Sequence, residues 1–197
     1  MIVFPKLPRG SYSLGYLSNG VQQQGAFGGP SKLINRLGDR YAMTVNSLRL
    51  RGDQGRGLVA KLTAGRSDKV RVPVYQPPFE GHPGAPRVAG AHNAQTTTLT
   101  IKNLTVGFNV KAGLFLTIIA ANGKRYLHQI VSDDAVVGGG GTAVVTVSPM
   151  IRVALTDNAQ IEMAEPTIEG FLNGQSNEWT LDYMRTIGVS FTVTEAE

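Results

Sequence analysis

Alternation of apolar and polar residues with a period of two constrains the fold of this chain more than any other feature. Successive side chains of a β-strand point to opposite faces, so this pattern is typical of strands with one buried face. The pattern recurs from the first third of the sequence to its end and predicts an all-β protein. The apolar positions of four such segments are Tyr41, Met43, Val45; Val70, Val72, Val74; Leu99, Ile101; and Val189, Phe191, Val193.

A β-hairpin is predicted around Asn122-Gly123. The dipeptide separates two runs of β-forming residues, 114–120 and 124–131. A two-residue hairpin loop needs positive φ at both positions, and Asn and Gly tolerate this best. We therefore expect a strand to return over residues 126–131 and the next strand to cover residues 143–147.

One short helix is predicted over residues 55–65. Leu58, Val59 and Leu62 lie on one side at helical spacing, and Gly65 fits the position just past the end of a helix. Gly55 and Gly57 weaken the start, because glycine disfavours helix. The sequence predicts two to three turns at most.

Segments rich in glycine and proline divide the chain. Residues 15–30 and 75–93 are expected to be irregular connectors, and a further boundary lies near Glu165-Pro166. We predict a β-sandwich-like or barrel-like body made of residues 1–93 and 165–197. A second, small antiparallel β domain of residues 94–164 is inserted into it.

Composition points towards assembly with other chains. Charged residues make up 17% of the sequence, below the roughly 25% that is usual in globular domains, so neighbouring chains are expected to cover part of the surface. The net charge of +5 is spread along the chain without a basic run, which argues against sequence-specific nucleic-acid binding. We expect no membrane span and no signal peptide, and synthesis in the cytoplasm.

Four consecutive glycines follow two acids between the strands expected at 126–131 and 143–147. A phosphate-binding glycine loop precedes a helix, whereas these glycines precede a strand. The acids lack the spacing of a calcium loop. The segment is therefore expected to be a strand-joining loop, either at a contact between subunits or at a solvent-exposed tip. The candidates for assembly contact are Gly138, Gly139, Gly140, Gly141, Asp133 and Asp134.

No arrangement of residues predicts catalysis, cofactor binding or metal binding. His82 and His92 fall in a connector, and His128 is expected on a strand as a surface or interface residue. Cysteine is absent, which excludes thiolate chemistry. The glutamates Glu162, Glu165 and Glu169 are expected to be scattered by strands and turns, and Trp179 is expected in the core. The chain is predicted not to be an enzyme.

Seven blocks of sequence, taken in order, resemble tail proteins of long-tailed phages and prophages. The order of the blocks carries the resemblance more than any single motif. The blocks are "FGGPSKLINRLGDRYAMTV", "GLVAKLTAG", "VRVPVYQPP", "VKAGLFLTI", "KRYLHQIVSD", "GTAVVTVSPMIR" and "PTIEGFLNGQSNEW".

The resemblance implies a structural virion protein of the tail tip, most like a distal tail protein. Such proteins have a β-sandwich-like body, often with an additional β domain, and form a ring, commonly a hexamer, between the tail tube and the baseplate hub. The implied partners are further copies of the chain and other tail proteins, without a cofactor. The implied location is the tail tip of the virion, after assembly in the host cytoplasm.

Two other functions fit the sequence. One is another virion part, a tail tube or head-tail connector subunit, and the other is a carbohydrate-binding β-sandwich module. A ring subunit is expected to extend arms towards its neighbours, whereas a sugar-binding module is expected to expose aromatic residues around a pocket.

Overall fold

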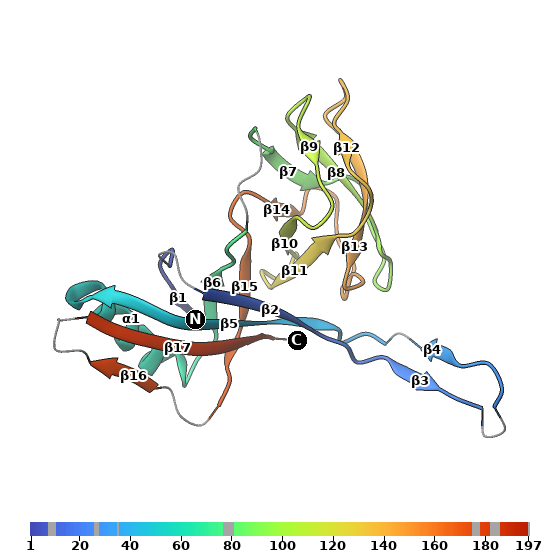
Figure 1. The fold of residues 1–197 in the computed structure, drawn as a ribbon. Helices are drawn as coiled ribbons and strands as arrows, with labels where there is room; N and C mark the ends of the chain where they lie inside the picture. The colour runs from blue at the N-terminus through green and yellow to red at the C-terminus, as the bar shows by residue number, and fades with distance from the viewer. Residues whose placement is uncertain are drawn as a thin grey trace.

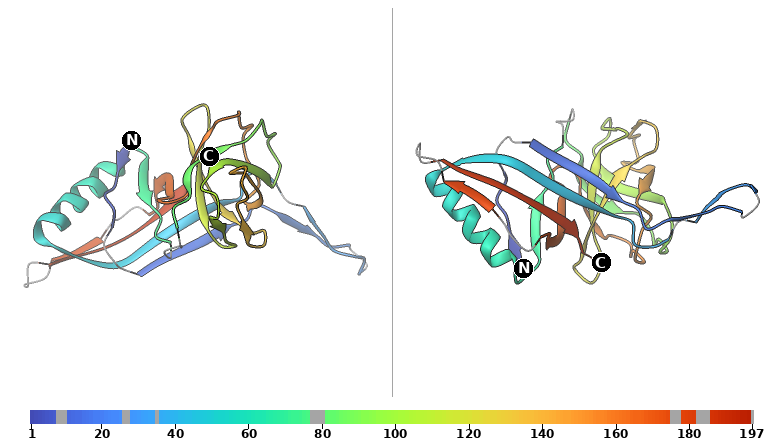
Figure 2. Two further views of the ribbon diagram at one scale, coloured as in Figure 1. Left: turned by 90° about the horizontal axis from the view of Figure 1, so that it is seen from above. Right: turned by 60° about the horizontal axis from the view of Figure 1, so that its bottom comes forward.

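The computed structural model describes residues 1–7, 11–25, 28–34, 36–76, 81–174, 178–181 and 186–196. The protein is all-β with one described helix, and it consists of a main sheet and a closed barrel (Figure 1). The barrel lies over one end of the main sheet and the helix over the other. A hairpin arm extends away from both (Figure 2).

The main sheet is built from segments far apart in the chain. All its neighbouring strands are antiparallel except β1 and β6, and β16 (Glu178–Leu181) pairs with β17 beside this path. The order is β1 (Ile2–Val3), β6 (Val70–Pro73), β15 (Thr167–Leu172), β17 (Thr186–Glu195), β5 (Arg40–Arg51) and β2 (Ser11–Leu17).

The predicted alternation is confirmed in this sheet. Met43, Val45, Val70 and Val193 are at most 1% exposed and face the core. The register of β5 against β17 shifts between Val189 and Phe191, which places one extra residue in β5. Such a bulge reverses the alternation, so that apolar residues on both sides of it face the same core.

Helix α1 (Gly52–Gly65) is longer than predicted, with 14 residues. Leu58 and Leu62 are buried against the sheet as expected. The predictions for Gly55 and Gly65 differ from the structure. A Cβ on Gly55 would lie 2.8 Å from Cβ of Ile187, and Gly65 is the last helical residue, not the residue after it. These glycines allow close packing on the sheet, and this tertiary contact outweighs their low helix propensity.

A closed barrel of six strands forms the second part of the molecule. Its interior is apolar, with Leu99, Ile101, Leu116 and Ile118 fully buried. The short strands β9 (Asn109–Val110) and β12 (Ala135–Val136) pair at the barrel end furthest from the main sheet (Figure 1). The order of barrel strands is β10 (Phe115–Ile119), β11 (Arg125–Ile130), β13 (Ala143–Ser148), β8 (Thr98–Leu104), β7 (Gly84–Val88) and β14 (Gln160–Glu162).

Two predicted connectors contain strands. β7 lies within residues 75–93, because its backbone pairs with β8 and β14 and thereby closes the barrel. β3 (Val21–Gln23) lies within residues 15–30 and pairs with β4 (Lys32–Ile34). Neither β3 nor β7 was predicted, because the glycine and proline residues in and around them favour irregular structure by local composition. The proposed domain limits stay predictions, although every barrel strand lies between residues 84 and 162.

The hairpin at Asn122-Gly123 is confirmed, but its loop differs from the prediction. Only Gly123 has positive φ, +76°. The amide of Gly123 donates to the carbonyl of Ala120 at 2.8 Å, and the amide of Ala120 donates to the carbonyl of Lys124 at 3.0 Å. The loop therefore spans three residues and ends in a left-handed glycine, which is a common alternative to the two-residue turn.

A buried carboxylate joins the barrel to the main sheet. Glu195 of β17 accepts hydrogen bonds from the amides of Leu127, 2.8 Å, and Tyr41, 3.2 Å, and forms an ion pair with Arg152. Burial raises the pKa of Glu195, and Arg152 opposes this rise. Nearby, the hydroxyl of Thr117 donates to the carbonyl of Thr167. Buried polar groups are tolerated when they are paired in this way.

Candidate functional site

The glycine run forms a tight turn at the barrel end furthest from the sheet (Figure 1). The amide of Gly141 donates to the carbonyl of Gly138, and the amide of Leu104 donates to Gly141, both at 3.0 Å. Gly141 has φ +63°, which side chains rarely adopt, and an added Cβ would lie 3.0 Å from the carbonyl oxygen of Leu104. Gly138 and Gly139 have open space around them. One glycine is thus required by the turn, and the others are exposed.

The two acids lie apart from the glycines, on the other side of β12. Asp134 accepts a hydrogen bond from the amide of Ala112 at 2.9 Å, so it stabilises the turn before β10. Asp133 is exposed. β13 follows the glycines, as expected, and no helix follows them. Contact of Gly138, Gly139, Gly140, Gly141, Asp133 and Asp134 with another subunit stays a prediction.

Sequence reasoning missed the arm formed by β3 and β4. The two strands pair only with each other in the described part of the chain, and all of β3 is exposed. Val21 is 42% exposed, and no charged residue occurs between Asn19 and Lys32. An isolated two-stranded ribbon is marginally stable in water. The sequence feature that could have predicted the arm is the Gly-Pro dipeptide at residues 29–30, which lies between two short segments with apolar residues, 21–23 and 32–34.

The base of the arm is firmly held. The hydroxyl of Tyr16 donates to the buried carboxylate of Asp39 at 2.7 Å, and the amide of Asn19 donates to the same carboxylate at 2.5 Å. The ring of Tyr16 packs edge-on against Tyr41. The arm therefore leaves the body in a defined direction, while its own strands lack a core.

An open groove of about 940 Å³ lies between the N-terminal segment, the first half of α1 and the end of β6. Phe4 and Leu58 are buried in its lining, and Lys61 and Asp53 lie at its polar part. The rings of Tyr12 and Tyr75 stack with centroids 5.7 Å apart, and Tyr75 is 57% exposed. An apolar lining with polar groups suits a sugar ring or an apolar side chain.

The clustered glutamates are paired with basic residues. Glu169 lies 3.2 Å from Arg71, Glu165 lies 2.6 Å from Lys6, and Glu162 forms an ion pair with Arg125. Glu162 and Glu165 line a second cavity of about 610 Å³ between barrel and sheet. The expectation that strands and turns scatter these residues is thus only partly right. Each carboxylate has its own cation.

The prediction for His128 was wrong. Its side chain is 1% exposed, because β11 directs it inward, and Nδ1 lies 2.8 Å from the carbonyl of Pro149. Burial lowers the pKa of His128 to about 4. His82 is exposed and accepts the amide of Gly84 at 2.9 Å. Within the described residues, no three His, Asp or Glu side chains are placed to hold a metal ion.

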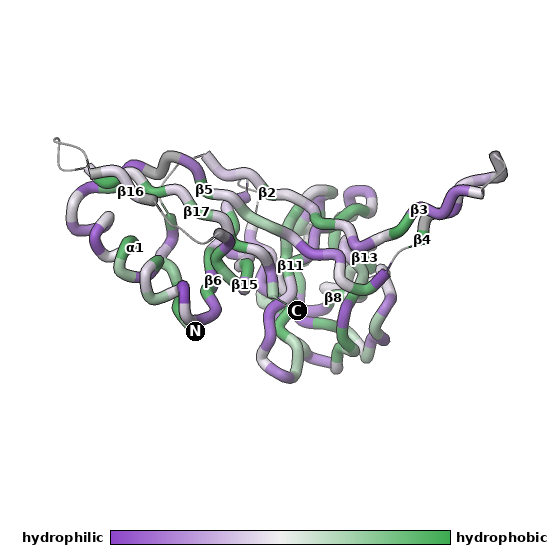
Figure 3. The backbone as a smooth tube through the Cα atoms, turned by 90° about the horizontal axis from the view of Figure 1, so that it is seen from below, coloured by the Kyte–Doolittle hydropathy of each residue, from purple (hydrophilic) through white to green (hydrophobic). Residues whose placement is uncertain are grey.

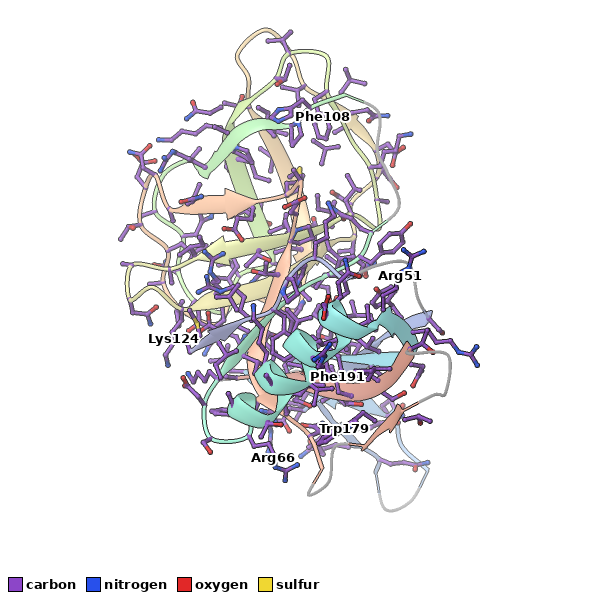
Figure 4. The ribbon with its side chains drawn as sticks, turned by 90° about the vertical axis from the view of Figure 1, so that its left-hand side faces the viewer. Arg51, Arg66, Phe108, Lys124, Trp179 and Phe191 are labelled. Carbon is purple, nitrogen blue, oxygen red and sulfur yellow. The ribbon has the colours of Figure 1, made fainter. Side chains whose placement is uncertain are left out.

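Trp179 was also misplaced by sequence reasoning. It lies on β16 at the edge of the main sheet and is 43% exposed, whereas Phe191 packs in the core beside α1 (Figure 4). The four residues of β16 pair with β17 alone, so this strand lacks a second neighbour to cover it.

A scan against models of protein families and a search of curated proteins both find no match to this chain. The described part of the chain contains no helix with the length and hydropathy needed to cross a lipid bilayer. The functional argument therefore rests on the arm, the groove and the exposed faces of the molecule.

Proposed function

We propose that this chain is a structural, non-enzymatic subunit of a phage tail tip. It assembles into a ring, commonly a hexamer in such proteins, which joins the tail tube to the baseplate hub. The single observation that carries the proposal is the β3–β4 arm. The arm is the type of extension expected of a ring subunit, and the resemblance of the sequence blocks supplies the viral context.

The chemistry of the arm supports contact with another copy of the chain. Its strands have no core of their own, and Val21 is exposed on it. A surface that docks on a different surface of the next copy makes a head-to-tail contact, and such contacts close into rings when the rotation permits. The low charge content agrees with a surface partly covered by neighbours.

Removal of the arm tests this proposal. Residues 20–37 are replaced by three glycines, which retain Asn19 and Asp39 at the base. Native mass spectrometry should show a closed oligomer for the unaltered chain and a monomer for the shortened one. Both should keep the same thermal unfolding midpoint within a few degrees, because the arm lacks contacts with the core.

A matched pair of point variants refines the test. Val21→Asp places a charge on the arm, and Val144→Asp places one on a more exposed position of the barrel strand β13. Only Val21→Asp should reduce the oligomer. A monomeric unaltered chain, or equal loss in both variants, contradicts the proposal. Growth into long tubes favours the tail tube alternative, and a ring that joins the portal end of the tail favours a connector subunit.

A carbohydrate-binding module is the second candidate, favoured by the stacked Tyr12 and Tyr75 beside the groove. Aromatic faces next to polar groups are common features of ligand sites. A glycan array should then show binding that is lost in Tyr75→Ala and retained in Trp179→Ala, an exposed aromatic remote from the groove lining. Absence of glycan binding to the unaltered chain rejects this candidate.

A further inference from the structure

The positive charge of the protein is concentrated in its first 52 residues. They contain seven of the 19 Lys and Arg residues, but Asp39 is the sole acid among them, out of 14 in the whole chain. Asp39 is 6% exposed and its oxygens accept hydrogen bonds at the base of the arm. The rest of the chain carries 12 basic and 13 acidic residues. The net charge of +5 therefore comes from β1 to β5 and their connections.

Three of these basic residues, Arg40, Arg49 and Arg51, lie on one face of the main sheet. β2, β5 and β17 run side by side along the main sheet (Figure 3). In each strand, alternate residues pack towards the barrel and α1, and the residues between them face outward. We call this the outer face. The sole acid in the three strands is Glu195, which is buried on the opposite side. The central residues of the outer face are Ser11, Ser13, Gly15, Ala42, Thr44, Ser190, Thr192 and Thr194.

Basic residues lie at both ends of the outer face. Arg49 and Arg51 are exposed at one end of β5 and form no ion pair with the described residues. Arg40 lies at the other end, and the exposed Lys32 and Arg36 precede it in the chain, on the side of the arm. The strand between Arg40 and Arg51 spans about 35 Å.

We propose that the outer face binds the phosphate backbone of double-stranded DNA without reading its sequence. Arg, Lys, Ser and Thr side chains are the usual partners of phosphate oxygens. One turn of the duplex is about 34 Å long, close to the separation of the two basic ends. This inference does not depend on ring assembly, because each single chain carries the face.

The composition of the outer face favours DNA over an acidic protein partner. Protein interfaces usually have an apolar core with aromatic anchors. The centre of this face instead presents small hydroxyl-bearing residues, and Thr44 and Thr192 form a hydrogen bond with each other at 2.9 Å. The exposed aromatic ring of Phe171 lies at its edge, opposite Thr194. Small side chains permit close approach of a regular, rod-like polyanion. The hydroxyl-rich centre lacks the groups that would discriminate between bases.

Fluorescence anisotropy with a labelled 30-base-pair duplex of mixed sequence tests the proposal over a range of salt concentrations. Arg49→Gln combined with Arg51→Gln should weaken binding about tenfold at low salt and reduce the slope of log K against log salt by about 2, because each lost phosphate contact lowers the slope by about 0.9. A shuffled duplex should bind equally well.

Two further variants make the result specific to the outer face. Lys111→Gln with Lys124→Gln removes the same charge from the barrel and should leave binding unchanged within twofold; Figure 4 shows Lys124 well apart from Arg51. Ser13→Glu adds a carboxylate to the exposed centre of the outer face and should weaken binding without removing a basic group. Circular dichroism confirms that each variant is folded.

Three outcomes overturn the proposal. One is that the unaltered chain does not bind the duplex at 50 mM salt. Another is that the arginine and lysine double variants lose equal affinity, which would show that binding depends only on the net charge of the protein. The third is equal affinity and equal salt slope for polyglutamate, which indicates an acidic protein partner. Loss of DNA binding in the arginine pair with normal oligomers separates this proposal from the proposed ring assembly.

Discussion

Two hairpins of this protein have the same antiparallel pairing and opposite environments. The β10–β11 hairpin lies in the barrel wall, where Leu116, Ile118 and Leu127 are fully buried. The β3–β4 arm pairs in the same antiparallel manner, but its described residues are exposed or half-buried. Local sequence predicts the first hairpin, through Asn122-Gly123, but not the second. The two hairpins differ in the number of their neighbours: the first is stabilised within the chain, and the second is expected, under the proposed function, to be stabilised by a partner.

The difference extends to the polar groups of the two hairpins. In the barrel hairpin, His128 is buried, and the backbone amide of Leu127 donates a hydrogen bond to the buried carboxylate of Glu195. The one charged residue of the arm strands is Lys32, which is exposed. Stability and its dependence on pH are therefore expected to reside in the barrel hairpin, and assembly is expected to depend on the arm.

The largest expected effect is the loss of a buried side chain from the barrel hairpin. Ile118→Ala should lower the free energy of unfolding by about 2–5 kcal/mol, because it leaves a cavity in a fully buried site. Val21→Ala in the arm should change it by less than about 0.5 kcal/mol. Urea denaturation measures both, and similar losses in the two variants would show that the arm is part of the cooperative core.

The second effect concerns pH. The pKa of His128 falls from 6.5 to about 4, so between these values the unfolded chain binds a proton that the folded chain does not. Stability from this group is present above pH 6.5 and is lost as the pH falls towards 4, by about 3 kcal/mol in total. Denaturation of the unaltered chain and His128→Gln at pH 7 and 4.5 measures the difference.

The comparison of the unaltered chain with His128→Gln also controls for the titration of Glu195. Burial raises the pKa of Glu195, so its contribution has the opposite sign and decreases as the pH rises through that raised pKa. Glu195 and the neighbouring Arg152 are present in both proteins, so the difference between them isolates His128. Parallel pH profiles for the two proteins would show that His128 does not titrate as stated.

A smaller effect is expected at the turn of the barrel hairpin. Gly123 has φ +76° and open space around the position of a Cβ. Gly123→Val should destabilise the protein by roughly 1 kcal/mol or more, through backbone strain alone. Gly123→Asn should cost less, because asparagine tolerates the left-handed region better. Thermal unfolding of both variants measures the strain, and equal midpoints would exclude it.

The smallest effect is expected in the glycine turn. Gly138→Ala with Gly139→Ala should change unfolding by less than about 0.5 kcal/mol, since both positions are open. Gly141→Ala should destabilise, because φ is +63° and the carbonyl of Leu104 is 3.0 Å from the added carbon. The double variant therefore isolates assembly. Normal oligomers in native mass spectrometry would identify this loop as a solvent-exposed tip.

Local patterns predicted the strands around Met43, Val72, Leu99 and Val193, since alternation is a property of neighbouring residues. Local patterns did not predict elements whose limits depend on contacts with residues far away in the chain. α1 begins at Gly52, before the predicted start, because Gly55 fits closely against Ile187 of the sheet. Residues 84–88 form β7 because two barrel strands accept them. The arm and the outer face were missed for the same reason, since both form only when strands from separate segments pair.

The sequence by itself determined the all-β class, the hairpin at Asn122-Gly123 and the buried faces of the main strands, because each follows from the spacing of residues within one segment. The tertiary structure alone decided closure of the barrel, the burial of His128, the exposure of Trp179 and the basic outer face. These depend on which segments become neighbours. That choice is made by long-range pairing and packing, whose free energy involves residues far apart in the chain.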